Sequence, residues 1–157
     1  MKLIEKYINF VGEKISYLIP AMVLLMVIVI VSRYFFGMGR TDLQELVMYF
    51  HALVFLGCAG YVMNKDEHVR VDIFYRNASN KYKNLINSVF GILFLLPIII
   101  VTFVYSLETI EASWKMKEVS TEAGGLAYVF IQKTFLVLFP ITLMASLISQ
   151  LLKIKWK

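Results

Sequence analysis

The sequence of 157 residues contains a single cysteine, Cys58, which lies inside an apolar stretch. One thiol excludes a disulfide or a thiolate metal site built within the chain. Charged residues are also scarce, because Asp, Glu, Lys and Arg make up only 17% of the sequence, whereas soluble domains average about 25%. The hydrophobic fraction is 59% and the mean hydropathy is +0.71. This composition excludes an ordinary soluble domain and indicates a protein that lies in lipid.

Catalytic and nucleotide-binding motifs are absent from the sequence. It has no GxGxxG, no P-loop, no HExxH and no nucleophile beside a recognisable base. We therefore expect neither an enzyme nor a cofactor site in this chain. The net charge of +5 would suggest nucleic-acid binding in a soluble protein. Here the basic residues lie between the apolar stretches, which is typical of membrane topology, so no nucleic-acid partner is expected.

Four apolar stretches are long enough to cross a bilayer. A hydrocarbon core of about 30 Å requires roughly 20 residues of helix at about 1.5 Å rise each. The stretches cover residues 17–36, 43–63, 85–107 and 134–152. The first is too long for the apolar region of a signal peptide and no Ala-x-Ala site follows it, so it is expected to remain as a span. The sequence thus predicts one all-α membrane domain over residues 1–157, with four transmembrane helices and short interfacial helices.

Lys and Arg residues are distributed unequally between the connections. The N-terminus, the middle connection and the C-terminus carry eleven of them, whereas the two other connections and their flanks carry five. Short basic loops stay in the cytoplasm. Both termini and the middle connection are therefore predicted to be cytoplasmic.

Segments outside the spans have amphipathic character. Residues 2–15 suit either a helix along the headgroups or an extension of the first span, and the middle connection, residues 64–84, is expected to hold a second interfacial helix. Apolar spacing continues after the third span, so that helix is expected to project from the bilayer and to end at Gly124 and Gly125. The expected contacts with phospholipid headgroups are Lys2, Lys14, His68, Arg70, Asp72, Arg76, Lys81, Trp114 and Tyr128.

Arg33 and Glu45 are charged residues near the ends of two neighbouring spans. Each lies about one turn inside the same boundary, so an antiparallel hairpin brings them to one depth. Because charges in a membrane segment are usually paired, we predict an ion pair between them. Two alternatives remain. Glu45 follows Asp42 at the spacing of a helix start, where it would serve the local amides, or the two charges take part in transport.

His51 lies inside the second span, on a stripe with Gln44, Met48, Phe55 and Cys58. Polar side chains on such stripes often bond across packed helices, and we expect this structural role for His51. A proton relay is the alternative, although the stripe offers no acidic partner.

Small residues follow in the same span. Gly57, Cys58, Ala59 and Gly60 form a patch that lets another helix approach closely, in this chain or in a partner. Pro97 and Pro140 are expected to kink the third and fourth spans without a chemical role.

Several segments, taken in order, resemble a known family. Arg33-Tyr34-Phe35-Phe36-Gly37 closes the first span, Gln44-Glu45-Leu46 and Phe55-Leu56-Gly57-Cys58-Ala59 lie in the second, and His68-Val69-Arg70-Val71-Asp72 follows it. Phe139-Pro140-Ile141 lies in the last span. The chain resembles, over nearly its whole length, the small (Q-type) membrane subunit of TRAP transporters, the tripartite ATP-independent periplasmic carriers.

The resemblance implies a subunit of the bacterial inner membrane that serves as a scaffold, or stator. A larger elevator-type membrane subunit would hold the substrate and sodium sites of this secondary active symport. A periplasmic substrate-binding protein would deliver a carboxylate, and the most similar branch is the one for sialic acid (N-acetylneuraminate). His51 departs from the aromatic residue expected of many members at its position.

Two other classes of small membrane protein are alternatives. A haem-binding anchor of a respiratory complex needs axial ligands inside two spans, and only His51 qualifies. A small proton-coupled multidrug exporter needs a carboxylate deep in a span, whereas Glu45, the nearest candidate, lies close to a boundary.

Overall fold

The computed structural model describes residues 2–65 and 79–155, and all regular elements in these ranges are helical. The chain order is α1 (Lys2–Ser16), α2 (Leu18–Phe36), α3 (Thr41–Gly57), α4 (Ala59–Asn64), α5 (Asn80–Phe90), the π-helical turn η1 (Gly91–Leu95), α6 (Leu96–Met116), α7 (Val129–Thr134), the 3-10 turn η2 (Phe135–Val137) and α8 (Leu138–Lys155).

Four helical stretches in the described ranges are long and apolar enough to cross a membrane, and the first two have a short break at Tyr17 and at Cys58. They run over Leu3–Phe36, Thr41–Asn64, Tyr82–Met116 and Val129–Leu152. Each contains the whole of one of the four stretches predicted from hydropathy. The predicted all-α fold with four membrane-spanning helices is therefore confirmed.

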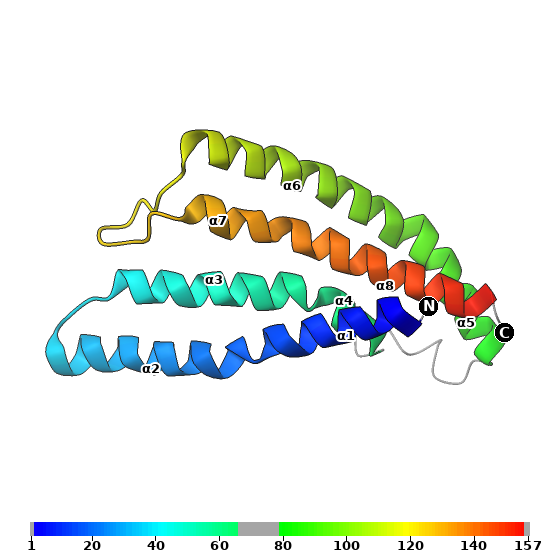
Figure 1. Cartoon of the computed structure of the whole chain (residues 1–157), viewed down its shortest axis with the longest axis horizontal. Coiled ribbons are helices and arrows are strands. Elements are labelled where there is room, and N and C mark those ends of the chain that lie inside the picture. Colours follow the sequence, from blue (N-terminus) through cyan, green and yellow to red (C-terminus); the bar gives the residue numbers. More distant parts are fainter. Residues whose placement is uncertain (1, 66–78, 156–157) are drawn as a thin grey trace.

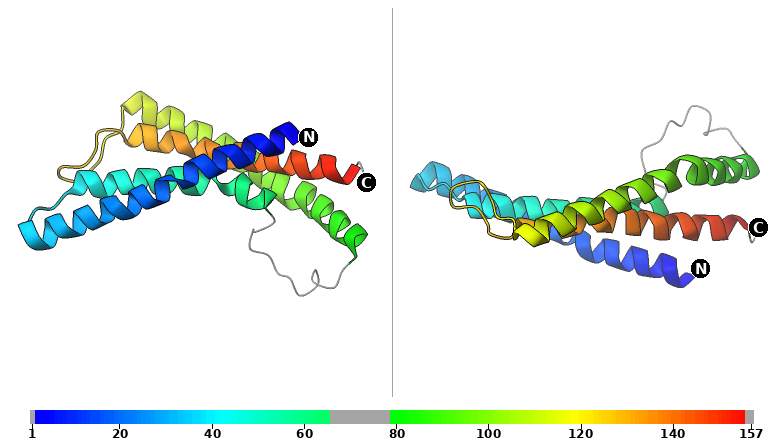
Figure 2. Two further views of the ribbon diagram at one scale, coloured as in Figure 1. Left: turned by 60° about the horizontal axis from the view of Figure 1, so that its bottom comes forward. Right: turned by 90° about the horizontal axis from the view of Figure 1, so that it is seen from above.

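The long helices lie side by side in a thin layer (Figure 1, Figure 2). Across this layer α2 contacts α3, α3 contacts α8, and α8 contacts α6. Apart from α1, which crosses one face of the layer against α3, α4 and α8, the helices have neighbours mainly along the layer, so much of their surface stays open. The core of the described residues is correspondingly small and centres on Ala59, Ile99, Leu143 and Leu147. Open apolar faces are unfavourable in water but are solvated by lipid tails.

Irregular turns lie one turn before two prolines of the long helices. Pro97 cannot donate a hydrogen bond to the carbonyl of Leu93, four residues earlier, and its ring clashes there. Leu93 lies in η1, and Leu136, which has the same relation to Pro140, lies in η2. Local π and 3-10 adjustments of this kind accommodate prolines in membrane helices. Figure 1 shows the helix from α5 to α6 as a long curve.

Helix α1 continues the line of α2 after a break at Tyr17 (Figure 1). It also contacts α3, α4 and α8. The approach is close at Gly12, where a Cβ would lie only 2.4 Å from the Cβ of Tyr61. Of the two arrangements considered for residues 2–15, the structure thus has the extension of the first long helix. The exposed Lys14 places its ammonium 5.6 Å from the ring of Phe10 and 5.7 Å from the ring of Tyr17.

Helix α5 starts the third long helix at Asn80, after the described part resumes at residue 79. The Ser79 hydroxyl caps it by accepting a hydrogen bond from the backbone N–H of Tyr82 at 3.3 Å. Helix α5 is continuous with η1 and α6 and is not a separate interfacial helix. The rest of the helix predicted in the middle connection falls on residues 66–78, which lie outside the described residues.

The other end of this long helix corrects a prediction. Helix α6 ends at Met116, well before Gly124 and Gly125. Lys117 adopts the left-handed conformation with a φ of 48°. The N–H groups of Lys117 and Glu118 donate to the carbonyls of Trp114 and Ser113 at 3.3 and 3.1 Å. These two bonds form a Schellman motif, which terminates a helix without requiring a glycine.

Candidate functional site: the loop end of the helix layer

Glu45, in the second turn of α3, holds the connection between α6 and α7, residues 117–128, called here the α6–α7 loop. One carboxylate oxygen accepts a hydrogen bond from the Ser120 hydroxyl, and the other accepts one from the backbone N–H of Leu126 at 2.6 Å. Ser120 and Leu126 also bond to each other, because the Ser120 N–H donates to the Leu126 carbonyl at 3.0 Å. Charge-assisted hydrogen bonds are about twice as strong as neutral ones. Glu45 therefore ties the α6–α7 loop to α3.

This contact takes the place of the predicted ion pair between Arg33 and Glu45. Arg33 is exposed near the end of α2 and makes no salt bridge within the described ranges. Glu45 does not cap α3 either, because both of its oxygens are bound by the loop. Near the start of α3, Asp42 instead pairs with Arg40 at 2.8 Å. Equal depth in the membrane did not place Arg33 and Glu45 on facing surfaces, and the loop donors reach the carboxylate instead.

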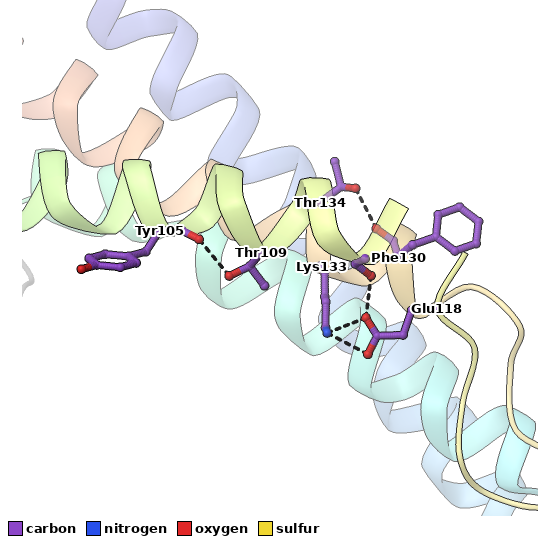
Figure 3. Close-up of polar contacts among 7 residues, drawn as sticks. Tyr105, Thr109, Glu118, Phe130, Lys133 and Thr134 are labelled. Carbon is purple, nitrogen blue, oxygen red and sulfur yellow. Dashed lines mark hydrogen bonds and ion pairs between the residues drawn. The ribbon is translucent and has the colours of Figure 1, made fainter. Parts of the chain in front are cut away.

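A second tie joins the α6–α7 loop to α7. Figure 3 shows Lys133 Nζ beside the carboxylate of Glu118, at 2.6 and 2.7 Å from its two oxygens. The Ser113 hydroxyl donates to the same carboxylate at 2.7 Å. The hydrogen bonds from Lys133 and then from Ser113 hold the pKa of Glu118 below its usual range. The two charged side chains are 34% and 29% exposed, so solvent screens the pair and it contributes mainly to the geometry of the loop.

Aromatic side chains surround this second tie. The Trp114 indole N–H donates to the Thr134 hydroxyl at 2.9 Å, and the Trp114 ring meets Phe130 edge-on with centroids 4.8 Å apart. Tyr128 packs on the same Phe130 ring at 6.4 Å. Lys117 Nζ lies 4.6 Å from the centroid of Trp114. The two predicted anchors Trp114 and Tyr128 are thus brought together around Phe130, and both remain exposed.

The connections 37–40 and 117–128 lie at the same end of the molecule, at the left of Figure 1, which we call the loop end. The two ties and the aromatic group all belong to it. Among residues 2–65 and 79–155, no three His, Cys, Asp or Glu side chains gather where they could hold a metal ion. The loop end therefore presents a surface of polar and aromatic side chains whose geometry is fixed by the two ties.

The patch of small residues makes contacts between helices of this chain. A Cβ on Gly60 would lie 2.2 Å from the carbonyl oxygen of Thr142 in α8. The Gly60 N–H donates to the Thr142 hydroxyl at 3.4 Å. Gly57 faces a side chain of α1 in the same way, and Cys58 Sγ lies 3.5 Å from a backbone carbonyl of α1. Ala59 belongs to the core. The patch therefore lies where α3 and α4 meet α1 and α8.

His51 lies on the open surface of α3. Met48, His51 and Phe55 are the exposed residues of α3, and we call these three residues the α3 stripe. The ring of His51 stacks on Phe55, with centroids 6.1 Å apart and an angle of 7° between the planes. Within the described residues, His51 does not make the bond to another helix that the sequence analysis expected.

Among the remaining predicted anchors, the structure describes the side chain of Lys14, which is exposed on α1. His68, Arg70, Asp72 and Arg76 lie outside the described residues, as do the side chains of Lys2 and Lys81.

Sequence reasoning missed several residues that the structure brings together. Ser120 and Leu126 lie in a connection without periodicity, so nothing local marked them as partners of Glu45. The opposite charges of Glu118 and Lys133 on the two sides of a short connection were a usable signal. Deeper in the molecule, the Ser146 hydroxyl donates to Asn64 Oδ1 at 2.8 Å.

Comparison with known proteins gives one result that covers most of the chain. The model of the family described as "Tripartite ATP-independent periplasmic transporters, DctQ component" matches residues 22–154. No curated protein and no solved structure matches the chain significantly. The matched range includes α3, the α6–α7 loop and α8, which together carry the loop end and the small-residue contacts. This is a family of transporter components and not of enzymes. The chain therefore belongs to the DctQ component family of the tripartite ATP-independent periplasmic transporters, as a membrane protein with several spans.

Proposed function

We propose that this chain is the non-transporting scaffold, or stator, of a sodium-coupled TRAP transporter for carboxylates, with sialic acid (N-acetylneuraminate) as the first substrate to test. The observation that carries the proposal is the position of the charges. Residues 18–32, 46–64, 84–107 and 134–152 contain no Asp, Glu, Lys or Arg. A transported anion and its coupling ion need polar sites near the midplane of the membrane. We therefore assign both sites to the large subunit.

The alternatives considered from the sequence receive no support from particular residues. Both carboxylate oxygens of Glu45 are bound at the loop end, and His51 faces away from the other helices of the chain. The family match also favours the TRAP component over an exporter or a haem-binding anchor.

The loop end is proposed to contribute to docking of the periplasmic substrate-binding protein. Glu45 and the pair of Glu118 with Lys133 hold the α6–α7 loop from two sides. A loop that is already ordered loses less conformational entropy when a partner docks. The exposed Tyr128 and Trp114 supply the aromatic surface that protein interfaces favour.

The proposed orientation is that of an inner-membrane protein with both termini in the cytoplasm and the loop end in the periplasm. It is supported by the excess of Lys and Arg in the termini and the middle connection, which also suits contact with anionic phospholipids. In a Cys58→Ser background, an impermeant thiol reagent added to intact spheroplasts should label Arg40→Cys and not Lys81→Cys. Labelling at position 81 would contradict the orientation.

Reconstitution tests the scaffold role directly. Uptake into liposomes should require this chain, the large subunit, the binding protein and an inward sodium gradient together. Uptake that is undiminished without this chain, or sodium-driven uptake by this chain alone, would show that it is not the scaffold. Competition with a panel of carboxylates, N-acetylneuraminate among them, tests the substrate separately.

A further inference from the structure

The α3 stripe is an open surface with an unusual composition for its depth. We propose that Met48, His51 and Phe55 pack against a transmembrane helix of the large membrane subunit, and that this helix supplies a hydrogen-bonding side chain to His51. The inference rests on the proposed function, because it takes the large subunit as the partner. It adds which face of the chain meets that partner and what chemistry the partner presents there.

His51 is placed near the middle of the bilayer. The second long helix, Thr41–Asn64, has 24 residues. At about 1.5 Å per residue His51 lies about 15 Å from its start, which is half of a hydrocarbon core of about 30 Å. At this depth the side chain cannot reach water at either surface.

The imidazole of His51 needs polar partners at that depth. In its neutral form one ring nitrogen donates a hydrogen bond and the other accepts one. Within the described residues the ring stacks on Phe55 and has no hydrogen bond or ion pair. Lipid tails offer neither donors nor acceptors, and ionisable side chains in spans almost always face protein or a water-filled cavity. The missing partner is therefore expected from another protein chain.

The open faces of α8 and α2 do not require such a partner. The exposed residues of α8 up to residue 152 are Ile141, Ile148 and Leu152. Those of α2 between residues 18 and 31 are also all apolar. Lipid tails solvate these faces well. Unlike these two faces, the α3 stripe carries a polar side chain, His51. Its members are three and four residues apart and form one ridge, which is the shape that fits the groove of a neighbouring helix.

A second copy of this chain fits the α3 stripe less well. In a parallel pair of identical helices, Phe55 would face Phe55 and Met48 would face Met48, so bulky residues would meet. Helix pairs in membranes usually meet through small residues. The small residues at Gly57 and Gly60 already face α1 and α8 of the same chain.

The experiment uses both membrane subunits, co-expressed and purified through a tag on this chain. The photoreactive p-benzoylphenylalanine replaces Met48 in one variant, and it replaces Ile148 in a matched variant that sets the background. Irradiation should link position 48 to the large subunit in a product of their summed mass. His51→Leu should lower the amount of large subunit recovered about tenfold, which corresponds to about 1.4 kcal/mol. His51→Gln, which keeps a donor and an acceptor, should recover most of the loss.

The outcomes separate the inference from the proposed function. If the unmodified chain captures the large subunit but position 48 links only to lipid or to a second copy of this chain, the α3 stripe is not the interface and the scaffold role stands. Equal recovery of the large subunit with His51→Leu and His51→Gln would show that the large subunit supplies no hydrogen-bonding side chain to His51. If the unmodified chain captures no large subunit, the proposed function and the inference fall together. The crosslink at position 48 is measured with His51 in place, so the result does not depend on whether His51→Leu folds.

Discussion

Replacing Gly60 with alanine is expected to destabilise the chain by about 2–4 kcal/mol. The new Cβ would lie 2.2 Å from the carbonyl oxygen of Thr142 and 2.6 Å from its carbonyl carbon. Both are backbone atoms of α8, so neither can rotate away, and α4 and α8 must separate by roughly 1 Å to restore ordinary contact. Overpacking of this kind costs about 1–3 kcal/mol. The separation also breaks the hydrogen bond from the Gly60 N–H to the Thr142 hydroxyl, which contributes about 0.5–1.5 kcal/mol.

Two other glycines provide matched controls for this substitution. A Cβ on Gly57 would lie 2.8 Å from Cδ1 of Ile15, which is the end of a flexible side chain, so Gly57→Ala should cost less than Gly60→Ala. A Cβ on Gly39 meets nothing within 4 Å, and Gly39→Ala should be neutral or stabilise by up to about 1 kcal/mol. Titration with sodium dodecyl sulfate in mixed micelles, followed by circular dichroism, gives the free energies of unfolding. A value for Gly60→Ala within about 0.5 kcal/mol of that for Gly39→Ala would refute the packing argument.

Two further predictions concern the loop end. Glu45→Gln should speed amide hydrogen exchange in the α6–α7 loop about 10- to 100-fold, because hydrogen bonds to a charged group contribute about 1.5–3 kcal/mol, whereas Arg33→Ala should leave it unchanged. Equal acceleration by both would instead support the ion pair. Because its pKa is lowered in the folded protein, Glu118 contributes stability that is complete above its unfolded pKa of about 4.3 and is lost as the pH falls through the lowered value. A Trp156→Phe background leaves Trp114 as the only tryptophan, and its fluorescence should therefore change in that acidic range. If the fluorescence of the Glu118→Gln variant changes by the same amount, the titrating group is not Glu118.

Much of the architecture could be predicted from the sequence because lipid imposes simple requirements. A helix that crosses the bilayer must satisfy its own backbone and expose apolar side chains, so uninterrupted apolar length is enough to locate it. Residues 84–107 show this clearly, because they carry no charge and lie inside one continuous helix. The end of α6 could not be found in this way. It depends on the left-handed conformation of Lys117. Glycine is the residue usually found in that conformation, so the sequence pointed to the glycines further along the chain instead.

The partners of particular side chains required the tertiary structure. Hydropathy gives the depth of a residue in the membrane but not the direction in which its side chain points. Arg33 and Glu45 share a depth, yet Glu45 is bound by Ser120 and Leu126, which are distant in the sequence and lack any periodic signal. The same limit applies to His51, whose place in the second span was evident while its position on an open face was not.

The sequence by itself thus determined the number of spans, their approximate limits and, through a string of local motifs, the family. These properties depend on composition and on the local order of residues, which do not change with the way the helices pack. Only the tertiary structure decided which polar groups meet, which glycines touch another helix and which ridge of α3 stays open. Those properties depend on the rotation of each helix about its axis, and this rotation is set by packing between segments that are far apart in the chain.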